Sequence, residues 1–146
     1  MQERLILRGL VDGMNLTQYK IKKISGDASF REFYKIEKNS KFTILVKANK
    51  DKFRNLIIYA AINELLIKNK IKAPKLVQEY FVKNMMEIEN LGSCSFLDHI
   101  KNKKNKLSDY KKLVELIIKL QKINFKKDIK FRNNKIRVKT HNLSEL

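Results

Sequence analysis

The order of hydrophobic patterns along this chain of 146 residues limits its fold more than any other feature. Three short runs typical of β-strands come first, one amphipathic helix follows, and two more strand-like runs come after the helix. The predicted strands are residues 19–24, 33–37, 42–48, 75–82 and 85–89. In the third, Phe42, Ile44 and Val46 share one face, and Leu45 falls on the other. The sequence therefore predicts an α+β fold with a five-stranded antiparallel sheet in the order βββαββ.

A helix is predicted between the third and fourth strands, over residues 53–69. Ile58, Ile62, Leu65 and Leu66 are spaced at i, i+4, i+7 and i+8 along it. They form one apolar stripe, which we expect to lie on the sheet. Pro74 ends the helical pattern, because proline disfavours α geometry in the residue before it and has no N–H to donate to a strand.

Two shorter helices are predicted after the fifth strand. Ser95 is the candidate N-cap of the first helix, and Ser108 is the candidate N-cap of the second. The apolar residues of the second helix repeat at i, i+3, i+4 and i+7, and they are Leu113, Leu116, Ile117 and Leu120. After residue 124 the periodicity is lost, and we expect a charged segment without regular structure. At the other end of the chain, residues 2–11 have the pattern of a short helix.

The formal net charge of +18 is the kind of charge that binds nucleic acid. Only six of the 33 basic residues are Arg, however, and sites that read phosphates or bases favour the forked guanidinium group. Because Lys, Ile and Asn are abundant along the whole chain, we interpret the charge as a solvated coat of lysines. A basic nucleic-acid-binding module is the alternative, and residues 101–139, with 15 basic and 3 acidic side chains, leave room for a basic face.

Cys94 is the single cysteine, so the chain cannot form an internal disulfide and a reducing compartment is expected. Charged residues interrupt the first ten positions, which therefore lack the apolar core of a signal peptide. No run approaches the roughly 18 apolar residues of a membrane span. We therefore expect a cytoplasmic protein that has no membrane partner.

The turn between the first two predicted strands is a candidate anion site. It reads GDASFR over residues 26–31. Small residues let backbone N–H groups approach a ligand closely, and the hydroxyl of Ser29 adds a donor. The same pattern also fits an ordinary hairpin turn, so both interpretations stay open on the residues alone.

Four stretches, in this order, resemble the aminoglycoside phosphotransferase-like family, in particular its branch of N-acetylmuramate and N-acetylglucosamine anomeric kinases. They are GDASFR at 26–31 with FYKI at 33–36, FTILVKA at 42–48, IKAPKL at 71–76, and MEIENLG at 86–92. Together they cover most of residues 21–123. The resemblance implies a protein-kinase-like N-lobe, a hinge and the first helices of a C-lobe.

In that family the loop after the first strand covers the nucleotide phosphates, and the hinge presents main-chain groups to the adenine edge. The resemblance therefore implies two sets of ATP-binding residues. They are Gly26, Asp27, Ala28, Ser29 and Phe30 in the loop, and Glu89, Asn90 and Leu91 in the hinge. A simple turn from strand to helix is the other interpretation of the hinge.

Lys47 ends the third strand, where kinase-like folds often place a lysine on the α- and β-phosphates, held by a helix glutamate. It is a candidate phosphate contact, although the sugar-kinase branch often lacks that lysine. Glu64 lies on the predicted helix but closer to Pro74 than a pairing glutamate should. A pair between Lys47 and Glu64 is therefore not expected.

Phosphoryl transfer of this kind needs a carboxylate that orients the acceptor hydroxyl and Asp or Asn ligands for Mg²⁺, usually in an H-x-D-x-x-x-x-N run with a later Asp. Asp128 and Asn133 have the D-x-x-x-x-N interval, but Lys126 replaces the histidine, and we interpret the match as coincidence. His99 and His141 have no carboxylate at a matching spacing, so surface or capping roles are expected. We assign no catalytic and no metal-binding residue.

Taken together, these patterns predict a nucleotide-binding N-lobe at residues 1–90, followed at 91–146 by the hinge and a C-lobe that is cut short. The resemblance implies a parent enzyme that transfers the γ-phosphoryl group of ATP to a sugar hydroxyl, with an amino sugar of cell-wall recycling as the acceptor. The Mg²⁺ ligands are expected in the missing part, so this chain alone should bind nucleotide weakly and catalyse nothing. A non-catalytic regulatory lobe of the same fold is a further alternative, and nucleic acid is not expected as a partner.

Overall fold

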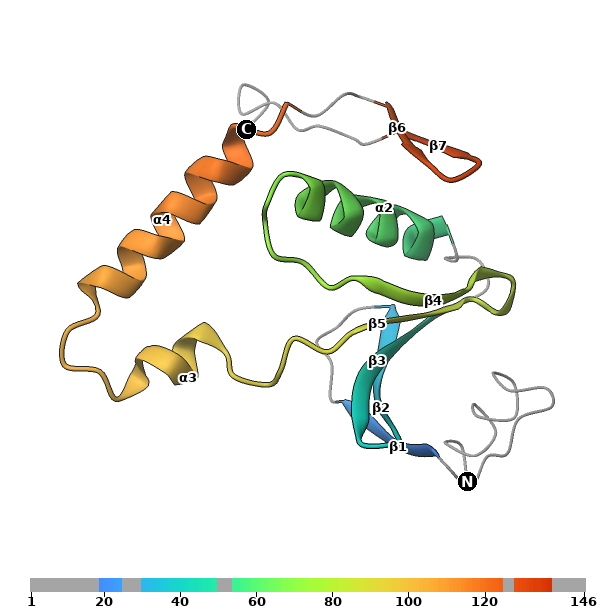
Figure 1. Cartoon of the computed structure of the whole chain (residues 1–146), viewed down its shortest axis with the longest axis horizontal. Coiled ribbons are helices and arrows are strands. Elements are labelled where there is room, and N and C mark those ends of the chain that lie inside the picture. Colours follow the sequence, from blue (N-terminus) through green and yellow to red (C-terminus); the bar gives the residue numbers. More distant parts are fainter. Residues whose placement is uncertain (1–18, 25–29, 50–53, 125–127, 138–146) are drawn as a thin grey trace.

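The computed structural model describes residues 19–24, 30–49, 54–124 and 128–137. Within these ranges the chain forms a five-stranded sheet, a helix packed on it, two further α-helices and a separate β-hairpin (Figure 1). The predicted α+β class and the βββαββ order are thereby confirmed. The predicted helix at residues 2–11 lies outside the described residues, as do Gly26, Asp27, Ala28 and Ser29.

The sheet has the strand order β1-β2-β3-β5-β4, and every neighbouring pair is antiparallel. Its strands are β1 (Tyr19–Ile24), β2 (Arg31–Lys38), β3 (Lys41–Ala48), β4 (Leu76–Tyr80) and β5 (Met85–Glu89). The predicted boundaries of β1 and β5 agree at both ends, and those of the other strands agree within two residues. A 3₁₀ turn (Phe81–Lys83) joins β4 to β5.

A two-residue turn at Asn39 and Ser40 joins β2 to β3. Both residues have positive φ, of 49° and 60°, which is the geometry of the hairpin turns that match the twist of a sheet. The turn sets Lys38 opposite Lys41. It thereby fixes which side chains of β3 point to each face of the sheet, because a slip of one residue would exchange the faces.

Each face of the sheet carries its own apolar cluster. The inner face, defined as the face on which helix α2 (Arg54–Lys68) packs, contributes Val46, Ala48, Met86 and Ile88. The outer face contributes Tyr34, Ile36, Leu45 and Met85. Val46 and its neighbour Leu45 are both fully buried although they point to opposite faces, so β3 is a central strand.

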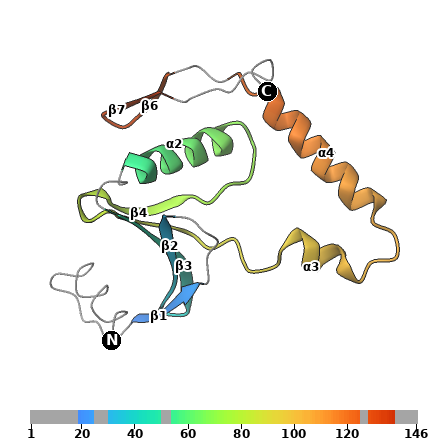
Figure 2. The same ribbon diagram turned by 180° about the vertical axis from the view of Figure 1, so that it is seen from behind.

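Helix α2 is apolar around most of its circumference. Its most deeply buried residues are Leu56, Ala60 and Ala61. The predicted contact stripe is therefore wrong, because its four members are only half-buried: Ile58, Ile62, Leu65 and Leu66. The physical reason is that α2 is covered from two sides, by the sheet on one and by the β-hairpin on the other (Figures 1 and 2), so no single apolar stripe marks its contact with the sheet.

The hairpin that covers α2 was not anticipated from the sequence. Strands β6 (Asp128–Phe131) and β7 (Asn134–Arg137) pair around a turn in which Arg132 has a φ of 52°. Phe131 and Ile136 are buried and join the inner cluster. The expected irregular segment after residue 124 is therefore wrong for these strands, which are too short for their alternation to stand out among the lysines.

Helix α3 (Phe96–Lys101) follows β5 and leads away from the sheet (Figure 1). The backbone N–H of Asp98 donates to the Ser95 hydroxyl at 3.0 Å, and the Asp98 carboxylate accepts from the Ser95 N–H at 3.3 Å. This reciprocal pair is a capping box, which confirms Ser95 as the N-cap.

Helix α4 (Leu107–Gln121) begins earlier than the sequence analysis expected. Ser108 is not its N-cap, because Lys106 holds that position and the Leu107 N–H donates to the Asn105 side chain at 3.0 Å. Leu113 and Leu120 on the predicted apolar stripe are half-buried, whereas Leu116 and Ile117 are exposed. None of the helices in the described ranges is long and apolar enough to cross a membrane.

Candidate functional site

One end of the sheet brings together three strand termini next to the predicted phosphate loop. The chain leaves β1 at Ile24, which lies opposite Phe33, and enters β2 at Arg31, which lies opposite Ala48 at the end of β3. We call this the loop end of the sheet. The loop residues Gly26, Asp27, Ala28 and Ser29 themselves lie outside the described residues.

The predicted hinge lies at the other end of the same sheet, which we call the hinge end. Glu89 closes β5 and lies opposite Thr43 on β3. The N–H of Glu89 donates to the carbonyl of Lys75 at 2.8 Å, so this group is already occupied. Asn90 and Leu91 follow the last residue of β5.

Asn90 and Gly92 shape the main chain of the hinge. The Asn90 side-chain oxygen accepts a hydrogen bond from the Gly92 N–H at 2.9 Å. Gly92 has a φ of 97°, a conformation that side chains other than hydrogen rarely allow. The Asx turn and the glycine together bend the chain out of β5 toward α3 and leave Leu91 exposed.

The loop end and the hinge end are separated by the length of one strand. Five residue steps lie between Thr43, opposite the hinge, and Ala48, opposite the start of β2. At roughly 3.4 Å per residue this is about 17 Å. An extended nucleoside triphosphate has a similar length.

Apolar side chains remain exposed on the inner face between these two ends. Ile24 on β1 is 37% exposed and Phe42 on β3 is 44% exposed. Both belong to the inner face, because Ile24 lies opposite Phe33, and Phe42 is four residues from Val46 on the same strand and so points to the same side. The Lys35 ammonium lies 4.3 Å from the centre of the Phe42 ring. This strip therefore combines a flat aromatic surface with positive charge.

The structure places Lys47 away from this strip. Lys47 alternates with Val46, so it lies on the outer face with Leu45, and its ammonium is 3.7 Å from the Glu32 carboxylate. Glu64, on α2, forms an ion pair of 2.5 Å with Lys68. Lys47 and Glu64 thus lie on opposite sides of the sheet, and each has another partner.

Phe30 and Arg31 form an aromatic stack at the loop end that the sequence analysis did not identify as a unit. The Arg31 guanidinium carbon lies 5.4 Å from the centre of the Phe30 ring and 5.1 Å from the centre of the Tyr59 ring on α2. Arg31 shares the inner face with Phe33 and Ala48. No local pattern in the sequence links Arg31 to Tyr59, because their contact depends on how α2 packs on the sheet.

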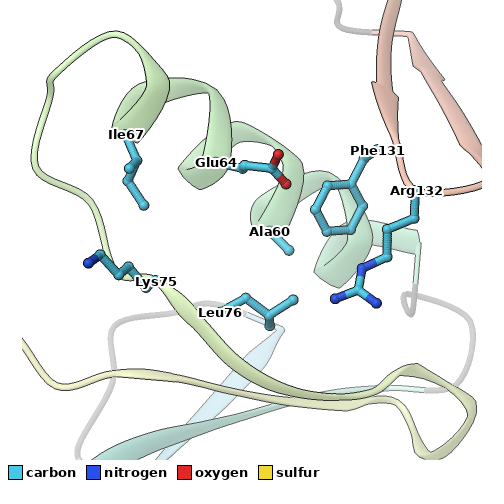
Figure 3. Close-up of a pocket in the computed structure, with 7 residues that line it drawn as sticks. All are labelled: Ala60, Glu64, Ile67, Lys75, Leu76, Phe131 and Arg132. Carbon is cyan, nitrogen blue, oxygen red and sulfur yellow. The ribbon is translucent and has the colours of Figure 1, made fainter.

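Two pockets flank the β6–β7 hairpin where it covers α2. The first has a volume of about 260 Å³, and Figure 3 shows Glu64, Phe131 and Arg132 around it. The second has a volume of about 350 Å³, with Ile57, Ile58 and Ile136 among its lining residues. Neither pocket is lined by a residue of the predicted ATP site.

The hairpin also contains both residues of the D-x-x-x-x-N interval, Asp128 and Asn133. Asp128 begins β6 and forms an ion pair of 3.2 Å with Lys135 on β7, and Asn133 lies in the turn. The two residues are therefore parts of a surface hairpin. This arrangement agrees with the interpretation of the interval as coincidence.

His99 has a carboxylate partner that its sequence spacing did not suggest. Its Nε2 lies 3.2 Å from Asp109 and 2.8 Å from the Lys103 ammonium, and Lys103 donates to Asp109 at 2.9 Å. The hydrogen bond from Lys103 is the main cause that lowers the pKa of Asp109, with a smaller contribution from His99. This cluster joins α3 to the first turn of α4, which makes its role structural. His141 lies outside the described residues.

A scan against protein-family models gives no match, and searches of curated proteins and of solved structures give none either.

Proposed function

We propose that this chain is the nucleotide-binding lobe of an ATP-dependent phosphotransferase that acts on a sugar hydroxyl. The observation that carries the proposal is the relation between the loop end and the hinge end. They are the two ends of one inner face, about 17 Å apart along β3, which suits a nucleoside triphosphate in an extended conformation. The four sequence stretches that resemble the amino-sugar kinases support the same assignment.

In this proposal the adenine ring lies at the hinge end, against the exposed ring of Phe42 and the side chain of Ile44 on the inner face. The adenine edge needs alternating donors and acceptors. Because the Glu89 N–H is bound to Lys75, we expect the main-chain groups of Asn90 and Leu91 to supply most of these contacts. Glu89 would contribute through its carbonyl.

The triphosphate would extend along β3 toward the loop end. There the resemblance assigns Gly26, Asp27, Ala28 and Ser29 to cover the phosphates, with Phe30 at the edge of the loop. Successive backbone N–H groups in such a loop form a concave anion site that needs no charged side chain. Lys22 and Lys35, opposite each other on the inner face, add positive charge along the path.

The described residues do not by themselves supply a magnesium site. Within the described residues there is no group of three or more His, Cys, Asp or Glu side chains that could hold a metal ion. We therefore derive no step through Mg²⁺ from this chain. Its own contribution to phosphoryl transfer would be to bind and orient ATP, and groups outside the described residues would be needed to activate the acceptor hydroxyl.

Isothermal titration calorimetry tests the proposal on the whole chain, with its fold checked by circular dichroism. We expect ATP to bind weakly, with a Kd on the order of 1 mM, and adenosine to bind more weakly still. No heat of binding at millimolar ATP in a folded sample would contradict the proposal. If duplex DNA bound instead, with an affinity that fell steeply between two salt concentrations, the basic nucleic-acid-binding module would be favoured.

A further inference from the structure

We propose that Arg31, which lies beside the rings of Phe30 and Tyr59, is the side chain that binds the nucleotide phosphates at the loop end. This inference rests on the proposed function, and it names a phosphate contact other than the lysine that kinase-like folds often use. It also gives the stack between β2 and α2 a function in binding, beyond its contribution to packing.

The face of the sheet on which each side chain lies favours Arg31 over Lys47. Arg31 lies on the inner face opposite Ala48, at the end of the sheet where β1 runs into the loop. Lys47, the neighbour of Ala48, points to the outer face and is paired with Glu32. A nucleotide on the inner face would therefore meet the guanidinium of Arg31, and the sheet would separate it from the ammonium of Lys47.

The geometry of the stack suits phosphate binding. A guanidinium group is planar, and its N–H donors point outward in its own plane. Rings at 5.4 Å and 5.1 Å from its central carbon are within the range of cation–π attraction, which restrains the side chain. Such restraint lowers the conformational entropy that phosphate binding would otherwise cost. The planar fork also matches the oxygens of a phosphate better than an ammonium does.

The two rings beside Arg31 come from different parts of the fold. Arg31 directly follows Phe30, and Tyr59 belongs to α2, which packs on the same inner face. The stack therefore links the start of β2 to the helix. Tyr59 acts as a positioning residue in this proposal, because its ring contacts Arg31 and would not itself contact the phosphates.

The test compares ATP, ADP and adenosine as ligands of the whole chain by isothermal titration calorimetry. Arg31→Gln should weaken ATP binding by ~10-fold or more and leave adenosine binding unchanged, since a charge-assisted bond to a phosphate is lost and the base site is kept. The affinity of Arg31→Lys for ATP should lie between those of the wild type and of Arg31→Gln, because lysine keeps the positive charge and loses the forked guanidinium. Arg132→Gln is the matched control, since Arg132 also lies beside a ring, that of Phe131, and is paired with Glu79 on β4, at the opposite edge of the sheet from β1.

Tyr59 supplies a second, independent pair of variants. Tyr59→Leu should weaken ATP binding several-fold without changing adenosine binding, whereas Tyr59→Phe keeps the ring and should behave as the wild type. Thermal unfolding of each variant shows whether the fold is retained. Arg31→Lys and Tyr59→Phe keep the test valid if a more severe variant does not fold.

The outcomes separate this inference from the proposed function. If the wild type binds ATP, and Arg31→Gln binds it equally well while Lys47→Gln loses it, the phosphate contact is Lys47 and the inference on Arg31 is wrong. If Arg31→Gln weakens adenosine and ATP equally, Arg31 acts on the fold and the inference is again wrong. A folded wild type that binds neither ATP nor adenosine overturns the proposed function together with the inference.

Discussion

Glu32 and Lys47 lie opposite each other on β2 and β3, and their side chains form an ion pair of 3.7 Å on the outer face of the sheet. The same carboxylate accepts hydrogen bonds from the Lys23 ammonium at 2.8 Å and from the Tyr34 hydroxyl at 3.1 Å. One glutamate therefore ties together β1, β2 and β3. The alternation along β3 places Lys47 on this face, and the ion pair holds its side chain beside Glu32.

The hydrogen bond from Lys23 is the main cause that lowers the pKa of Glu32, with smaller contributions from Tyr34 and Lys47. A carboxyl group whose pKa is lowered by folding stabilises the folded state above its unfolded pKa of about 4.3, and this contribution is lost as the pH falls through the folded pKa. Glu32→Gln should therefore lower the stability of the chain at neutral pH and flatten its decline in acid. Urea unfolding at several pH values between about 3 and 7 measures the free energy of unfolding of both chains.

Glu115→Gln makes the same chemical change on the exposed side of α4 and serves as the control for Glu32→Gln. It should leave the stability at neutral pH, and the loss of stability as the pH falls, close to those of the wild type. An acid decline of equal steepness in the wild type and in Glu32→Gln would show that the cluster around Glu32 does not contribute.

Phe131→Ala should release the hairpin from α2, because it removes a buried ring from the contact between them. Truncation of a buried Phe costs about 3 kcal/mol or more where the site cannot collapse. Hydrogen exchange should show faster exchange in β6, β7 and α2, with β1 to β3 less affected. Lys130→Ala, an exposed change in the same strand, should leave the exchange unaltered.

Asp109→Asn should loosen the connection between α3 and α4, because the buried carboxylate binds both Lys103 and His99. An amide in its place keeps the shape and loses the charge that the lysine requires. Hydrogen exchange in α3 and in the first turn of α4 should become several-fold faster. Since the pKa of Asp109 is lowered in the folded state, the wild type should approach the behaviour of the variant as the pH falls through that pKa.

An unchanged exchange rate in α3 of the Asp109→Asn chain would mean that other contacts hold the two helices. Ser95→Ala provides the comparison within the same helix. It removes the capping box and should destabilise α3 by about 1 kcal/mol without affecting α4.

The sheet could be predicted from the sequence because its signals are local. In β3, Phe42, Ile44 and Val46 alternate with Leu45, and β5 is followed by Asn90 and Gly92. A window of a few residues is therefore enough to predict each strand. The turn at Asn39 and Ser40 likewise follows from the tolerance of Asn for positive φ. These positions agree with the structure to within one or two residues.

The contacts of α2 could not be predicted in the same way. Its sequence is apolar on both sides, and only the β6–β7 hairpin explains why Ile57 and Ile58 face away from the sheet toward Ile136. The pairing of Arg31 with Tyr59 has the same origin, since it depends on the helix crossing the sheet at that point. The face of Lys47 could have been inferred from its alternation with Val46, had the packing of α2 been known.

The central claim is that ATP lies along the inner face between the hinge and Arg31. Two-dimensional NMR of the labelled chain during titration with ATP tests this most directly. The account predicts that the amides of Asn90 and Leu91 and the side-chain signal of Arg31 shift together and saturate with one affinity, while the signals of β6 and β7 stay in place. Shifts confined to the hairpin, or spread without saturation over the exposed lysines, would contradict it.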